Sequence, residues 1–175
     1  QDHYNVELLD NWQDSSLVSN SSEVKYNDCW GYEQNGIEYA FIGSTEGIHF
    51  LRINDDDDAT LTEVDFVPGK FSSMSVVHRD MKVFKNYLYA VCDEGASSLQ
   101  VIDLSYLPDS AHVVMENDSS FARVHNLFFD EANELMYACG ITPNASGIPQ
   151  ALISMRVYSV ANPILPILLY TGPND

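Results

Sequence analysis

Short apolar segments, each ended by turn residues, recur along the chain, and the clearest succession covers residues 78–107. Three such segments, at residues 80–84, 87–92 and 99–104, are separated by Asn, Asp and Gly. Segments of five or six residues rich in Val, Ile, Tyr and Phe are typical of strands in an antiparallel meander. One meander cannot bury both of its faces, so the pattern predicts further copies beside it.

A Tyr-Ala pair in the middle segment has counterparts on both sides. The three pairs begin at Tyr39, Tyr89 and Tyr137, which lie 50 and 48 residues apart. Each pair follows a strand-like segment and a turn, and each precedes a further strand-like segment. Units of roughly 40–50 residues with about four strands are the repeat of β-propellers. An ordinary sandwich with evenly spaced strands is the alternative.

We therefore predict an all-β chain that forms a β-propeller segment of about three four-stranded antiparallel blades plus the start of a fourth. The expected boundaries are 1–23 for an N-terminal segment and 24–175 for the partial propeller, with blades at 24–58, 59–108 and 109–160 and the next blade starting at 161–175. Because a closed propeller needs at least about four blades, we expect either a longer protein or self-association through the open sheet edge.

The charge balance excludes two classes of partner. The sequence has 26 acidic and 8 basic residues, a formal net charge of −18. Nucleic acids and anionic lipids both require a basic face, so neither is expected to bind. The longest apolar run, residues 164–170, contains Pro166 and is far shorter than the ~20 residues of a membrane span. No membrane insertion is expected in this chain.

Two groups of residues bear on cofactors. The run of four acids from Asp55 to Asp58 reads as a solvated loop, with a structural calcium site as the alternative, since hard cations take clustered oxygens. The three cysteines, Cys29, Cys92 and Cys139, have no close spacing and so predict neither a disulfide framework nor a zinc motif. We expect no cofactor, with calcium or another divalent metal as the alternative.

When the units are aligned on their tyrosines, polar residues recur where the innermost strands begin. The candidate ligand-binding residues, which include one tryptophan, are Asp28, Trp30, His78, Arg79, Asp80, His125 and Asn126. Innermost strands line the axial channel of a propeller, so these side chains should converge at one mouth of that channel.

Two interpretations fit that location. One is a ligand or metal site, because His and Asp can bind zinc or another divalent ion. The other is a ring of salt bridges and hydrogen bonds that joins the blades, for example from Arg79 to Asp28 or Asp80.

Known catalytic motifs are missing from the sequence. It has no Gly-x-Ser-x-Gly, no phosphate-binding glycine loop and no His-Glu-x-x-His. We predict a non-catalytic binding module. The alternative is a metal-assisted hydrolase or lyase with its site at the channel mouth.

The same segments resemble a known family. Residues 89–91 followed by 99–105 resemble the LVIVD-type propeller repeat, and most of the chain looks like the N-terminal portion of the choice-of-anchor B family. The similar segments are 5–9, 27–32, 38–43, 79–84, 99–107, 125–127 and 137–140. The chain departs from the family pattern at His78, where the family usually has Trp, at residues 96–98, which lack glycine, and at Asn54-Asp55, which replaces Asp-Pro.

This resemblance implies an exported bacterial protein, extracellular, periplasmic or held at the cell surface by a variable terminal anchor. No established enzymatic activity comes with the family. The partner expected on this basis is a protein or carbohydrate at the cell surface.

Overall fold

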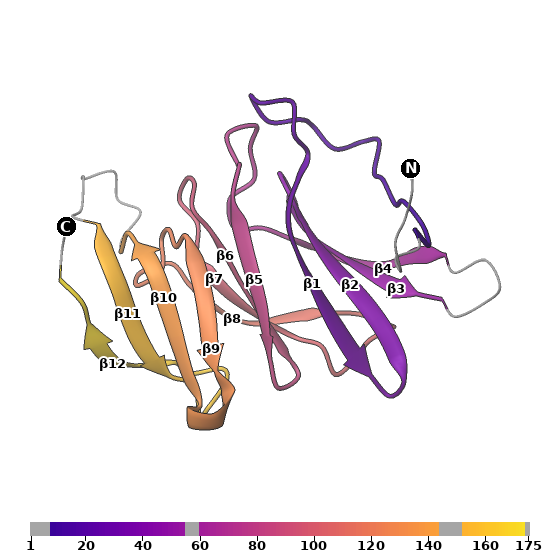
Figure 1. Cartoon of the computed structure of the whole chain (residues 1–175). Helices are drawn as coiled ribbons and strands as arrows, with labels where there is room; N and C mark the ends of the chain where they lie inside the picture. Colours follow the sequence, from indigo (N-terminus) through magenta and orange to yellow (C-terminus); the bar gives the residue numbers. More distant parts are fainter. Residues whose placement is uncertain (1–7, 55–59, 144–151, 174–175) are drawn as a thin grey trace.

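The computed structural model describes residues 8–54, 60–143 and 152–173 (Figure 1). These residues form twelve β-strands and one 3-10 turn, with no α-helix among them. The elements are β1 (Tyr26–Gln34), β2 (Ile37–Ser44), β3 (Gly47–Ile53), β4 (Leu61–Pro68), β5 (Arg79–Phe84), β6 (Tyr87–Cys92), β7 (Leu99–Asp103), β8 (His112–Asn117), β9 (Asn126–Asp130), η1 (Glu131–Asn133), β10 (Leu135–Ile141), β11 (Ile153–Ser159) and β12 (Ile167–Thr171).

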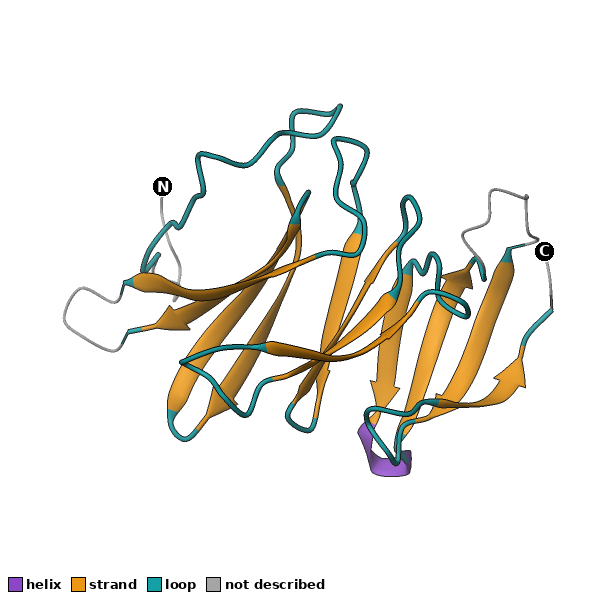
Figure 2. Cartoon of the chain, turned by 180° about the vertical axis from the view of Figure 1, so that it is seen from behind, coloured by secondary structure: helices purple, strands orange, loops and turns teal. Residues whose placement is uncertain are grey.

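The strands form three four-stranded antiparallel sheets, and in each sheet consecutive strands are neighbours. The sheets are β1–β4, β5–β8 and β9–β12, and Figure 2 shows the same three sheets from behind. The expected all-β class and the expected three four-stranded antiparallel units are confirmed. The first strands of the sheets lie side by side, since β1 contacts β5 and β5 contacts β9.

The grouping of strands differs from the expected boundaries. Residues 60–67 fall within the expected second unit, 59–108, but β4 pairs with β3 from Gly47 and Pro68 to Ile53 and Leu61. Likewise β8 pairs with β7, and β12 pairs with β11. The fourth strand of each sheet therefore lies after the expected boundary, because hairpin pairing with the preceding strand satisfies its backbone groups. Residues 167–171 complete the third sheet and do not begin a fourth.

An Asn-Gly hairpin turn joins β1 and β2. Gln34 pairs with Ile37, and both turn residues have positive φ, 57° for Asn35 and 76° for Gly36. Two successive positive φ angles are what a tight two-residue hairpin needs, because this turn matches the twist of the strands.

The three aligned tyrosines lie on matching second strands: Tyr39 on β2, Tyr89 on β6 and Tyr137 on β10. Tyr39 is 2% exposed in a cluster between the first two sheets, with Met81 and Leu88. Tyr89 is 0% exposed in a second cluster, between the second and third sheets. Tyr137 is only half-buried, because it lies on the outward face of the third sheet. The hydrophobic core is therefore located between the sheets.

The two end faces of this arrangement differ in polarity. The residues that precede Tyr89 and Tyr137, Leu88 and Met136, are 0% exposed against the preceding sheet, but the equivalent residue of the first sheet is the exposed Glu38. Its cross-strand partner is Glu33, also exposed. The N-terminal segment covers another part of that face.

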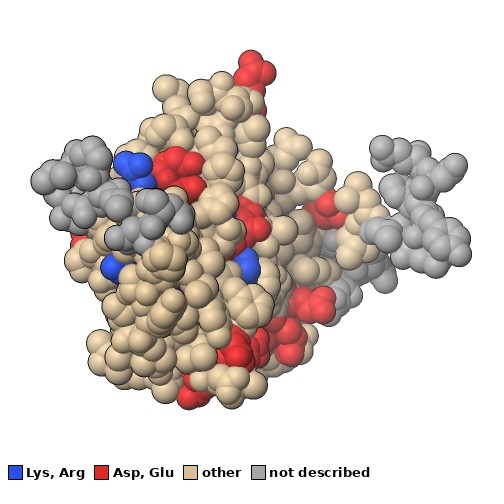
Figure 3. Space-filling view, turned by 60° about the vertical axis from the view of Figure 1, so that its left-hand side comes forward, with Lys and Arg blue, Asp and Glu red and all other residues tan. Residues whose placement is uncertain are grey.

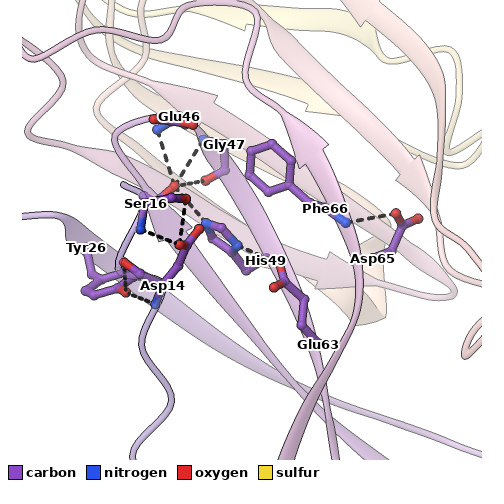
Figure 4. Close-up of polar contacts among 10 residues, drawn as sticks. Asp14, Ser16, Tyr26, Glu46, Gly47, His49, Glu63, Asp65 and Phe66 are labelled. Atoms are coloured by element: carbon purple, nitrogen blue, oxygen red, sulfur yellow. Dashed lines mark hydrogen bonds and ion pairs between the residues drawn. The ribbon is translucent and has the colours of Figure 1, made fainter. Parts of the chain in front are cut away.

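The N-terminal segment contacts the first sheet through a buried histidine. The ring of Trp12 lies 4.9 Å from that of His49, which is 2% exposed. His49 Nδ1 lies 2.7 Å from Glu63 Oε1, and its Nε2 lies 3.0 Å from Ser44 Oγ (Figure 4). Both ring nitrogens therefore have partners within the protein, as expected of a histidine with a structural role.

Replacing Tyr89 by Ala should lower the free energy of unfolding by about 3–5 kcal/mol, the usual loss when a large aromatic side chain is removed from a core. Tyr137→Ala is the matched control and should lose about 1 kcal/mol or less, because its side chain is half-exposed. Equilibrium unfolding in urea measures both losses. Equal losses would show that the second and third sheets do not bury Tyr89 between them.

Candidate functional site

A cavity of about 310 Å³ lies where the inner strands β1, β5 and β9 begin. We name it the inner-strand pocket; its lining residues are Asn27, Asp28, Val77, His78, Arg79, Asp80, His125 and Asn126. Six of the seven residues proposed from the sequence line it. The structure thus brings them together, and their use in ligand binding stays a prediction.

Trp30, the seventh residue, lies beside the pocket and contacts a lysine. Lys82 Nζ lies 4.4 Å from the centre of the Trp30 ring. The same nitrogen donates to Asp80 Oδ1 at 2.6 Å and lies 3.6 Å from Asp28 Oδ2. Sequence reasoning missed Lys82. Its position two residues after Asp80 could have indicated it, because alternate residues of a strand share a face.

Two carboxylates link the first strands of neighbouring sheets. Asp28 Oδ2 accepts a hydrogen bond from Met81 N at 3.3 Å, and Asp80 Oδ2 accepts one from Leu127 N at 2.5 Å. The two donors are equivalent, because each pairs with the alanine that follows the second-strand tyrosine. This repeated link corresponds to the structural interpretation of the polar ring.

Arg79 has different partners from those expected. It pairs with neither Asp28 nor Asp80. Its Nε donates to Ser44 O at 2.7 Å and its Nη2 to Phe71 O at 2.6 Å. Arg79 and Asp80 are adjacent in a strand, so their side chains point to opposite faces. The guanidinium is buried, and burial lowers the pKa of Arg79 from its ordinary value.

The close approach of the chain to this guanidinium requires a glycine. A Cβ added at Gly69 would lie 2.5 Å from Arg79 Nη1. Arg79 therefore fixes loops of the first sheet against β5.

The two histidines supply the half-exposed polar groups of the pocket. The side chains of His78 and His125 are 56% and 49% exposed, and their ring centres lie 5.6 Å apart. His78 Nδ1 lies 3.3 Å from Glu94 Oε1, and His125 Nδ1 lies 2.7 Å from Asp93 Oδ2. Neighbouring acids in the turn after β6 thus hold one ring each.

The backbone around both histidines is also fixed. His78 N donates to Glu94 Oε2 at 3.1 Å, and His125 N donates to Cys139 O at 3.0 Å. Gly140 has a φ of 64°, and a Cβ there would lie 2.8 Å from His125 Cβ. Sequence reasoning missed the role of Asp93 and Glu94, which follow the second strand at a turn, a place where solvated acids are common.

Asn126 occupies the position in β9 that Asp80 occupies in β5. Asp80 pairs with Val91, and Asn126 pairs with Cys139, each two residues after the tyrosine of its sheet. Asn126 is exposed. Among the residues that the structure describes, no hydrogen-bond partner of its side chain is found.

Within the described ranges, no three or more His, Cys, Asp or Glu side chains are grouped so as to hold a metal ion. The alternative calcium site at Asp55 to Asp58 lies outside the described residues. All three cysteines are free thiols. No helix in the described ranges is long and apolar enough to cross a membrane.

Comparison of the chain with family models, with curated proteins and with solved structures gives no match.

Replacing Asp80 should separate its role as an acceptor from its charge. Asp80→Ala leaves the buried Leu127 N–H without a partner, so the free energy of unfolding should fall by about 1–3 kcal/mol at neutral pH. Asp80→Asn keeps an oxygen acceptor and should lose less. Urea unfolding of the two variants measures the difference, and equal losses would argue against the bond to Leu127.

The pH dependence of the same variants gives a second readout. Burial raises the pKa of Asp80 above 3.8, although Lys82 opposes the shift. A carboxyl with a higher pKa in the folded state ionises more readily in the unfolded chain, so its contribution to stability falls as pH rises from about 3.8 through the raised pKa. Stability of Asp80→Asn relative to wild type should therefore increase over that window. A constant difference across the pH series would contradict this.

Proposed function

We propose that the three sheets are blades of a β-propeller and that the chain is a non-catalytic binding module of an exported protein. The inner-strand pocket is its ligand site. The observation that carries this proposal is the convergence of six candidate residues, from three different strand starts, on that one pocket.

The repeated contacts between sheets support the propeller arrangement. At both junctions the first strand of one sheet lies beside the first strand of the next, β1 beside β5 and β5 beside β9 (Figure 1). Each junction has the same kind of hydrogen bond, donated by Met81 N to Asp28 Oδ2 and by Leu127 N to Asp80 Oδ2. A repeated junction between equivalent strands is what rotation about a common axis produces, and the inner strands then line that axis.

The outward face of the third sheet has the features expected of a surface on which a further blade packs. Phe128 is 63% exposed and, with Phe129 and Tyr137, lines a hollow of about 520 Å³. Figure 3 shows a broad area without charged side chains on this side of the molecule. The tyrosines equivalent to Tyr137 are both buried by the next sheet, so a sheet of the same kind fits here.

The polar groups of the pocket favour binding. Asp28 and Asp80 accept hydrogen bonds from backbone N–H groups and pair with Lys82. Arg79 donates to carbonyl oxygens. We assign a structural role to Asp28, Asp80 and Arg79. His78, His125 and Asn126 remain accessible. Imidazole and amide groups both donate and accept hydrogen bonds, which suits the hydroxyl and amide groups of a cell-surface carbohydrate or protein. The resemblance to the choice-of-anchor B family supports export and a surface location.

The ligand site can be tested on an array of cell-surface carbohydrates, with the affinity of each positive measured by calorimetry. We expect Asn126→Ala and His125→Ala each to weaken binding by about tenfold or more, the equivalent of about 1.4 kcal/mol. His112→Ala is the matched control, since His112 lies outside the pocket, and it should bind like wild type. Binding that is unchanged in both pocket variants would refute the proposed site, and cleavage of a bound carbohydrate would favour the hydrolase or lyase.

The uncovered face can be tested by sedimentation velocity over a range of concentrations. Burial of apolar area drives association, so we expect residues 1–175 to self-associate and Phe128→Ser to reduce it. Met74→Ser is the control, because Met74 is 61% exposed and lies outside this face. A strictly monomeric wild type, or an equal effect of both variants, would show that this face receives no second surface.

A further inference from the structure

We infer that His78 and His125 bind one divalent first-row transition-metal ion, such as Zn²⁺, through their Nε2 atoms. This inference rests on the proposed function in taking the inner-strand pocket as the ligand site, and it adds the cation through which a ligand would be held. Two histidines are fewer than the three residues of a grouped site, so the argument depends on how these two are oriented.

The separation of the rings suits a shared ion. A zinc ion about 2.0–2.1 Å from an imidazole nitrogen is roughly 3 Å from the centre of that ring, so two rings at a tetrahedral angle have centres about 5 Å apart. The ring centres of His78 and His125 are 5.6 Å apart, and the ring planes are inclined by 60°. The observed separation of the ring centres is thus close to the separation that a shared ion requires.

The hydrogen bonds of the rings select Nε2 as the ligand atom. In each histidine the Nδ1 atom contacts a carboxylate, Glu94 for His78 and Asp93 for His125. A metal-binding histidine commonly donates its other N–H to a carboxylate, which fixes the tautomer and the ring orientation. In the part of the chain that the structure describes, neither Nε2 atom has a hydrogen-bond partner, and both residues line the pocket.

The charge around the pocket favours a cation. Asp28, Asp80, Asp93 and Glu94 lie in it or at its edge, where they outnumber Lys82 and Arg79. The whole chain has a net charge of −18. A cleft lined mainly by one sign of charge raises the local concentration of the opposite ion.

Two protein ligands leave the remaining coordination positions open. Closed structural zinc sites use four protein ligands, whereas open sites retain water or an exogenous ligand. An ion held by His78 and His125 would therefore exchange with ions in solution. Its open positions could coordinate an oxygen atom of a bound carbohydrate or peptide. Imidazole suits zinc, copper and nickel better than calcium or magnesium, so calcium should not replace zinc here.

The test is a calorimetric titration of Zn²⁺ into untagged, chelator-treated protein, without any carbohydrate. We expect about one ion per chain, loss of that binding in His78→Ala and in His125→Ala, and about 10–100-fold weaker binding in Asp93→Asn, as for other carboxylates behind metal ligands. His112→Ala is the matched control and should retain the site. Circular dichroism checks that every variant is folded, and Ca²⁺ replaces Zn²⁺ in a parallel titration.

Several results would overturn the metal site. They are no zinc binding by wild type, retention of the ion in the folded His78→Ala and His125→Ala variants, or its loss in His112→Ala. Because this titration contains no carbohydrate, its failure leaves the carbohydrate experiment unaffected. Carbohydrate binding that persists in excess chelator would distinguish the two proposals further. It would support the pocket as the ligand site and show that the metal is not needed to hold the ligand.

Discussion

Face-to-face contact between neighbouring sheets is the interaction on which the structure depends. Each four-stranded sheet has two faces and cannot bury either one alone. Aromatic side chains of the second strands fill the spaces between the sheets. Tyr39 lies between the first and second sheets, and Tyr89 lies between the second and third. Because these contacts fix one sheet on the next, they also determine how the starts of β1, β5 and β9 meet. The pocket is thus a product of hydrophobic contacts some distance from it.

Polar contacts then set the fine position of the inner strands. Asp28 and Asp80 each accept a backbone hydrogen bond from the next sheet, and Arg79 donates to carbonyl groups of the preceding one. Buried polar groups are expensive unless they are paired, so these bonds permit only a narrow range of sheet positions. Asp28, Asp80 and Arg79 are thus engaged in bonds between sheets, and the accessible polar groups of the pocket are His78, His125 and Asn126.

The sequence was most informative where local pattern and structure coincide. The segment at residues 87–92 is β6 as predicted, and the tyrosine spacing located the matching second strands, because strand period and turn residues are local properties. The fourth strands were assigned to the wrong units, since an alternating segment does not reveal which neighbour it pairs with. The partners of Arg79 were also wrong, because main-chain carbonyls leave no trace in a residue pattern. The acids behind the histidines were missed for a related reason: a turn acid at the surface resembles any other turn acid until the histidine beside it is known.

The exposed Glu33 and Glu38 give the row of sheets a direction. At the junctions inside the molecule, equivalent positions hold Val83 or Phe129 and Leu88 or Met136. An additional layer can bury these positions when they are apolar, but on the first sheet it would have to dehydrate two carboxylates. A sheet that packs against β1–β4 must therefore supply polar partners for these carboxylates, whereas a sheet that packs against β9–β12 can be apolar, so identical copies joined head to tail into a filament are disfavoured.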